Sequence, residues 1–150
     1  MSSIVDALYE LKYNPFEYGP YLASFYTAVG ESESNLLLAP LVIPLCSHPV
    51  FGQKLFNSNI RSTIWSVFDD RTKFYDLQER IDEFQALTEQ CIQYCLVNDW
   101  LFVDEHSLAL RACHESDSVF TNQKSAEKLG RLFKGHSVVE IYAFLGVKPR

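Results

Sequence analysis

Apolar residues recur at helical spacing directly after a helix-start signal near the N-terminus. Asn14 suits the N-cap position, Pro15 loses no hydrogen bond at the first helical position, and Glu17 stands where a capping box places an acid. Residues at intervals of three and four then lie on one side, and Gly30 provides the end signal. The pattern predicts an amphipathic helix over residues 14–30, with an apolar face formed by Tyr18, Leu22, Phe25, Tyr26 and Val29.

The next segment, residues 36–47, is almost wholly apolar. Periodicity alone does not separate a helix from a strand in such a run. Pro40 and Pro44 exclude a central strand, because proline has no N–H to donate to a sheet. We therefore expect a short buried helix that is kinked at Pro44 and ends before Pro49.

Two further helices are expected in the middle of the chain. Ser58 can cap a helix whose inner face holds apolar residues, and Asp69 or Asp70 can open a much longer one. Alternation of apolar and charged residues then continues to Val97 and predicts one amphipathic helix of about seven turns. The inner positions of the two helices are Ile60, Ile64, Val67 and Phe68, and then Phe74, Leu77, Ile81, Phe84, Thr88, Cys91 and Cys95.

A strand pattern at residues 100–103, a polar turn at 104–107 and a returning strand at 108–110 predict a β-hairpin. Two helices follow. Ala126, Leu129, Leu132 and Phe133 define the inner face of the first, and Gly135 ends it. The second is marked by a capping box that begins at Ser137, by Gly146 and by Pro149.

These elements predict a mainly α fold: a helical domain with a small β-hairpin, resembling a winged helix, because the hairpin follows a run of helices. The length of 150 residues fits one domain. We expect residues 1–150 to form this single domain, with a helical body over about 14–110 and a C-terminal helix pair over about 122–146.

The amino-acid composition predicts that some aromatic residues face a partner. Aromatics make up 14% of the chain, more than one core of this size requires, and they are enriched at protein interfaces. The net charge of −6 argues against general affinity for nucleic acid. Residues 1–110 hold 6 Lys or Arg and 15 Asp or Glu, whereas residues 111–150 hold 7 and 4, so an acidic body carries a basic tail.

Candidate catalytic and metal-binding groups are few. Cys91 and Cys95 share a helix face, but no third or fourth ligand has a recognisable spacing, so we interpret them as core residues. Cys113 and His114 are neighbours in sequence, which does not make a catalytic pair. Phosphate-binding glycine loops and the GxSxG motif are absent from the sequence. We expect a cytoplasmic protein that is not an enzyme and has no catalytic, cofactor-binding or metal-binding residues and no cofactor.

The sequence offers one candidate contact surface. Lys124, Lys128 and Arg131 are four and three residues apart, so they form one ridge on the helix side opposite Leu129 and Phe133. Two interpretations remain open: an ordinary solvated face, or a contact with a DNA backbone or with an acidic partner surface. The last helix is apolar around most of its circumference, which predicts that part of it meets a partner.

The order of these segments resembles the middle-component family of bacterial three-component ABC ATPase systems, a group that includes Lamassu-type anti-phage defence. Residues 113–121 match nothing in that pattern. The resemblance is carried by an Asn-Pro helix start, a proline-punctuated apolar segment, a helix with Thr63 and Trp65, and two C-terminal helices, at residues 13–16, 37–49, 57–69, 126–133 and 139–149.

The resemblance implies a non-catalytic adaptor or regulatory subunit. In such systems an SMC/Rad50-like ABC ATPase senses foreign DNA and an effector, often a nuclease, delivers toxicity; the middle component bridges or regulates the two. Contact with DNA would then occur only through the complex, and no membrane is involved. The alternative is a stand-alone winged-helix DNA-binding regulator, which the hairpin and the basic ridge favour.

Overall fold

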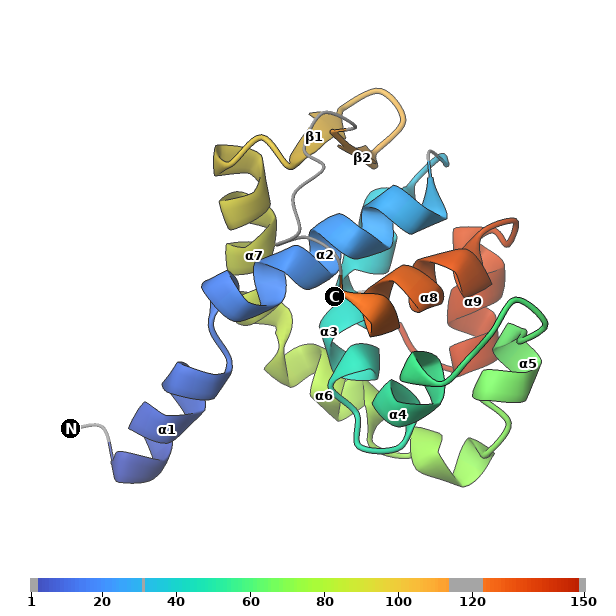
Figure 1. The fold of residues 1–150 in the computed structure, drawn as a ribbon, viewed down its shortest axis with the longest axis horizontal. Coiled ribbons are helices and arrows are strands. Elements are labelled where there is room, and N and C mark those ends of the chain that lie inside the picture. Colours follow the sequence, from blue (N-terminus) through green and yellow to red (C-terminus); the bar gives the residue numbers. More distant parts are fainter. Residues whose placement is uncertain (1–2, 31, 114–122, 149–150) are drawn as a thin grey trace.

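The computed structural model describes residues 3–30, 32–113 and 123–148. It is mainly helical and carries a two-stranded antiparallel hairpin, which confirms the predicted fold class and is compatible with a winged-helix arrangement (Figure 1). The elements in order are α1 (Ile4–Lys12), α2 (Pro15–Val29), η1 (Asn35–Leu38), α3 (Ala39–Cys46), α4 (Phe51–Phe56), α5 (Ile64–Val67), η2 (Arg71–Phe74), α6 (Leu77–Glu83), α7 (Gln85–Val97), β1 (Leu101–Asp104), β2 (Ala109–Ala112), α8 (Lys124–Phe133) and α9 (Val138–Leu145), where η marks a 3₁₀ helix.

Helix α2 is the central element and packs against α7 on one side and α8 on the other (Figure 1). Its start is the predicted one, since the Asn14 side chain accepts a hydrogen bond from the Glu17 N–H at 3.0 Å. Helix α8 crosses it at Gly130, where an added Cβ would stand 2.6 Å from the Phe25 carbonyl oxygen. The absence of a side chain at Gly130 therefore sets how closely α8 approaches the core.

Helix α3 is the buried proline-containing helix that the sequence predicts, preceded by one 3₁₀ turn. Its last carbonyl groups have no partner within the helix. The Arg80 guanidinium supplies one by donating to the Pro44 carbonyl oxygen at 3.2 Å and to the Ser47 hydroxyl at 2.8 Å. Arg80 also lies 5.5 Å from the centre of the Phe84 ring. This side chain from α6 thus holds the C-terminal end of the most buried helix.

Strands β1 and β2 pair in the predicted hairpin, with Leu101 opposite Ala112 and Asp104 opposite Ala109. The segment between α2 and α3 lies along it. Ser34 donates its N–H to the Ser107 carbonyl oxygen at 2.7 Å, and Leu36 donates to the Leu108 carbonyl oxygen at 3.1 Å. These bonds attach the hairpin to the helical body.

The predicted helix at Ser58 is wrong. The chain forms a turn there, in which Asn59 donates its N–H to the Ser62 hydroxyl at 3.0 Å and Arg61 donates to the Asn59 side chain at 2.8 Å. Helix α5 begins only after Thr63, which forms a capping box with Ser66. Ile60, expected on an inner face, is 96% exposed. A stronger capping signal five residues later decides where the helix starts.

The predicted seven-turn helix is also wrong as one continuous element. Its residues form η2, α6 and α7, and Phe84, with φ −91° and ψ 5°, separates the last two. Helix α6 packs against α3, whereas α7 packs against α2 as well, and the two run in different directions (Figure 1). Phe84 itself is buried. The apolar stripe remains continuous because the chain bends where its packing surface changes.

Helices α8 and α9 form the expected C-terminal pair. The Ser137 side chain accepts from the Glu140 N–H at 3.1 Å, and Gly146 ends α9 in the left-handed conformation at φ 70°. The Tyr142 hydroxyl donates to the Leu37 carbonyl oxygen at 2.5 Å, across 105 residues of sequence. One cluster of buried side chains extends from Tyr18 to Val147. In the described parts of the chain, no helix has the length and apolar character needed to span a bilayer.

Candidate functional site

Helix α8 presents the predicted basic ridge on its outer side. Ala126, Leu129 and Leu132 are among the residues that face the core, while Lys124 and Arg131 are exposed. Lys128 is half-buried. Helical spacing in the sequence is thus sufficient to place the three cations on one face.

The cations are not simply solvated, because two of them surround Phe56 at the end of α4. The ammonium groups of Lys124 and Lys128 lie 5.6 and 5.8 Å from the centre of its ring, within the range of a cation–π interaction. Lys128 also donates a hydrogen bond to the Phe56 carbonyl oxygen, and Arg131 pairs with Glu127. Phe56 remains 53% exposed, so an aromatic edge and the cations form one surface.

A groove of about 380 Å³ continues this surface toward the turn before α5. Ile60 projects there with nearly its whole side chain in solvent. The surface therefore combines positive charge with exposed apolar groups, which is typical of a protein-binding site more than of a DNA-binding one. We call it the α8 surface, defined by Phe56, Ile60, Lys124, Lys128 and Arg131; the groove itself is lined by Ser58, Asn59, Ile60, Ser62, Lys128, Arg131 and Leu132.

A second apolar surface lies on α9. Ile141, Tyr142 and Leu145 are buried, but Val139 is 78% exposed. The exposed side borders a shallow groove of about 490 Å³, which we call the α9 groove. Part of α9 is left uncovered by the segments that the structure describes, as the sequence predicts. The α9 groove is lined by Leu37, Val138, Val139, Tyr142, Ala143, Gly146, Val147 and Lys148.

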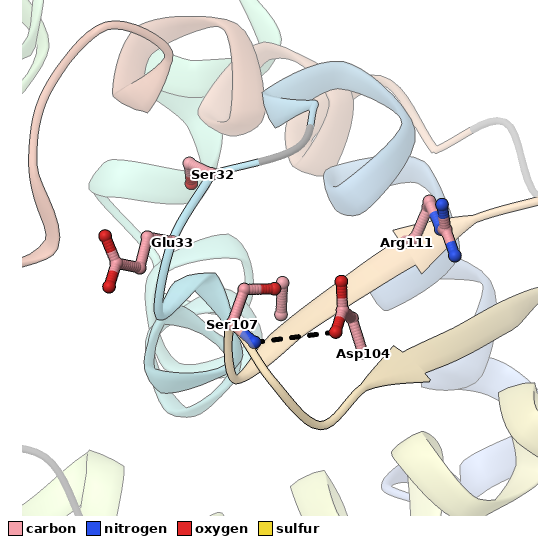
Figure 2. Close-up of a pocket in the computed structure, with 6 residues that line it drawn as sticks. Ser32, Glu33, Asp104, Ser107 and Arg111 are labelled. Atoms are coloured by element: carbon pink, nitrogen blue, oxygen red, sulfur yellow. Dashed lines mark hydrogen bonds between the residues drawn. The ribbon is translucent and has the colours of Figure 1, made fainter.

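The hairpin borders a third pocket, of about 330 Å³ (Figure 2). Ser32 and Glu33 reach it from the segment after α2, and Asp104, Ser107 and Arg111 from the hairpin. Hydrogen bonds from the side chain and backbone of Ser107 hold the pKa of Asp104 below its usual range. A carboxylate kept ionised in this way is a poor general base at neutral pH, so the geometry favours a turn-stabilising role.

The cysteines are placed as core residues. Cys91 and Cys95 are fully buried free thiols, and the Cys95 thiol donates to the Gly19 carbonyl oxygen at 3.2 Å. Burial raises the pKa of each to about 12, so neither forms a reactive thiolate at neutral pH. Among residues 3–30, 32–113 and 123–148, no group of His, Cys, Asp and Glu is arranged to hold a metal ion.

Of the sequence neighbours Cys113 and His114, the structure describes only the first. Cys113 is half-buried at the end of β2, whereas His114 lies outside the described residues. So does most of the segment 113–121.

The sequence did not predict two features of the structure: the exposure of Ile60 and the presence of helix α1. Ile60 was expected inside, and helix α1 was not expected. Ser3 and Asp6 form the signal that would have revealed α1, since the Asp6 N–H bonds the Ser3 hydroxyl at 3.1 Å and the Ser3 N–H bonds the Asp6 carboxylate at 3.3 Å. Exposed Ile4 and Leu8 follow at helical spacing.

One family model matches residues 2–149 and is described as ABC-three component (ABC-3C) system Middle Component 3. The match covers nearly the whole chain, including α1, the α8 surface and the α9 groove. No curated protein and no solved structure matches the chain.

Proposed function

The chain belongs to the Middle Component 3 family of ABC-three component systems, and from this premise we propose that it is a non-catalytic adaptor subunit. It joins an SMC/Rad50-like ABC ATPase to an effector such as a nuclease, in a cytoplasmic anti-phage defence complex of the Lamassu type. It holds no cofactor or metal and meets DNA only through the complex. Four free cysteines fit a reducing compartment.

The α8 surface carries this proposal. Solvent exposure of Ile60 and Phe56 on a small domain costs free energy unless a partner covers them, and exposed apolar groups of this kind mark interaction sites. The cations beside them favour a partner with acidic residues around an apolar side chain, because charge complementarity steers association. An adaptor needs such a surface, whereas it needs no reactive group.

The buried thiols support the non-catalytic part of the proposal. Two polar residues of the hairpin pocket, Asp104 and Ser107, are engaged in a turn, in which Asp104 accepts the His106 N–H at 3.1 Å and the Ser107 N–H at 3.5 Å. Neither arrangement brings a nucleophile to an activated base.

Co-purification with the ATPase and effector encoded beside this chain tests the proposal. Ile60→Asp, and charge reversal at Lys124, Lys128 and Arg131, should weaken assembly and phage protection. Exposed charges such as Lys124 and Arg131 contribute little to stability, whereas reversal at half-buried Lys128 also removes its contacts with Phe56, so circular dichroism must verify that this variant is folded. Val97→Asp is the matched control for Ile60→Asp, since Val97 is 77% exposed at the far end of α7. Assembly and protection at wild-type level in both α8 variants would reject the α8 surface as the docking site.

A further inference from the structure

Helix α1 has an apolar face that the other residues described in the structure do not cover. Ile4, Val5 and Leu8 are 81%, 73% and 59% exposed, and Ile4 and Leu8 are one helical turn apart. Figure 1 shows α1 projecting from the body of the molecule. Its beginning is nevertheless fixed by the reciprocal hydrogen bonds of Ser3 and Asp6. The first turn of α1 is thus capped, although the described part of the chain offers its apolar face no surface to pack against.

A helix of nine residues is not stable by itself in water, because it is shorter than the roughly 12–15 residues that isolated helices need. Its exit from the body is also fixed. The Tyr13 ring lies 5.8 Å from the Tyr18 ring and 5.2 Å from the Phe84 ring. The aliphatic face of α1 therefore requires cover from some other surface.

The α9 groove has matching chemistry. Apart from Lys148, its lining residues are apolar or glycine, and it is open to solvent at Val139. Asp6 lies in the first turn of α1, beside Val5, so a carboxylate borders the apolar face of the helix and is opposite in charge to Lys148 of the groove.

The α1 helix does not reach the α9 groove of its own chain. Tyr13 holds the end of α1 beside the start of α2, whereas Leu37 of the groove follows the opposite end of α2. At 1.5 Å per residue, α2 is about 22 Å long and α1 only about 13 Å. An α1 helix that fills the α9 groove must therefore come from another molecule.

We propose that two copies of this chain exchange their α1 helices, each placing Ile4, Val5 and Leu8 in the α9 groove of the other. One nine-residue helix buries less surface than a stable interface needs, and reciprocal exchange doubles that area. Exchange also closes the assembly as a two-fold dimer, whereas a one-way contact would continue into a ring or a filament. This dimer goes beyond the adaptor role and does not depend on it.

Light scattering on the isolated protein tests the exchange. The wild type should have the mass of two 17.2 kDa chains, and Leu8→Asp or Val139→Asp should each reduce it to one. Val97→Asp, an equally exposed valine elsewhere, should remain a dimer. Circular dichroism verifies that each variant is folded, and Ala143→Glu replaces Val139→Asp if the latter is not.

Mixing the two monomeric variants provides the decisive measurement. The Leu8→Asp chain keeps its groove and the Val139→Asp chain keeps its α1, so an equimolar mixture retains one intact contact. Because this contact buries half the area of the exchange, we expect a heterodimer that is much weaker than the wild-type dimer and forms only at high protein concentration, where neither variant alone associates. A monomeric wild type, dimeric single variants or a mixture that stays monomeric would each overturn the exchange. None of these outcomes involves the ATPase, so the adaptor proposal stands or fails separately.

Discussion

The side chain of Asn35 pairs with the backbone of Leu110, 75 residues further along the chain. Its amide nitrogen donates to the Leu110 carbonyl oxygen at 3.1 Å, and its amide oxygen accepts the Leu110 N–H at 2.6 Å. Both residues are fully buried. The Asn35 carbonyl oxygen in turn accepts the Tyr26 hydroxyl at 2.8 Å. Asn35, at the start of η1, thus joins α2 and the hairpin through its backbone and its side chain.

Asn35→Ala should lower the free energy of unfolding by about 3 kcal/mol, because it leaves two buried backbone groups of Leu110 unpaired. Urea unfolding followed by circular dichroism measures the change. Asn98→Ala, which removes an exposed amide that donates only to the Tyr94 carbonyl oxygen, is the control and should cost less than about 1 kcal/mol. Equal losses in the two variants would contradict the role of the buried pairing.

Replacing Cys91 and Cys95 together with Ala should destabilise the protein by about 2 kcal/mol, since buried sulfur atoms are lost and small cavities remain. Complex assembly should persist at permissive temperature. A fully folded and assembled double variant that loses all phage protection would reopen a metal or thiol role.

The His48 ring accepts hydrogen bonds at Nδ1 from the N–H groups of Val50 at 3.1 Å and Phe51 at 3.2 Å, where α4 begins. Only the neutral ring accepts them. Burial lowers the pKa of His48, and the charge of Arg80 adds to this. Protonation therefore opposes folding at this position.

Because the pKa of His48 is lower in the folded state, its contribution to stability is complete above the unfolded value of about 6.5. It should be lost progressively as the pH falls below 6.5 toward the folded pKa, where the unfolded chain binds a proton that the folded chain does not. His48→Asn keeps an acceptor at this position and should remove that part of the pH dependence. Thermal unfolding of the wild type and of His48→Asn between pH 5 and 8 measures this difference. Melting temperatures that change in parallel with pH in both proteins would exclude His48 as the cause of the pH dependence.

The isolated protein should bind duplex DNA poorly. Its net charge is −6, and Glu79, Asp82 and Glu83 give the helices before the hairpin an acidic character. Two of the three α8 cations already contact Phe56. Fluorescence anisotropy at near-physiological salt should detect no sub-micromolar binding, and such binding would favour the winged-helix regulator instead.

The α8 surface shows how much of a binding surface a local sequence pattern can predict. Helical spacing is enough to place Lys124, Lys128 and Arg131 on one face, because neighbours three and four apart share a side in any α-helix. Their aromatic partner, Phe56, is 72 residues from Lys128, and no local pattern relates the two. The charged residues of the α8 surface could therefore be predicted from the sequence, whereas its apolar residues, Phe56 and Ile60, could not.

Local chemistry determined the elements whose signals lie within a few residues. Asn14, Ser137 and Gly146 mark helix ends in the structure where the sequence predicts them. The reason is that a capping residue satisfies backbone groups of the adjacent first or last helical turn. The hairpin follows equally from alternation and a polar turn. The family resemblance includes the Asn-Pro helix start and the last two helices, and the order of its segments is a property of the sequence alone.

Tertiary structure decided which surfaces are covered. The apolar stripe before the hairpin bends at Phe84 because α7 packs against α2 in addition to α3, whereas α6 packs against α3. Ile60 is exposed because a later capping box starts α5. Helix α1 and the α9 groove remain open for the same reason. Burial depends on which distant segments arrive at a face, and that is settled only when the whole chain packs into one core.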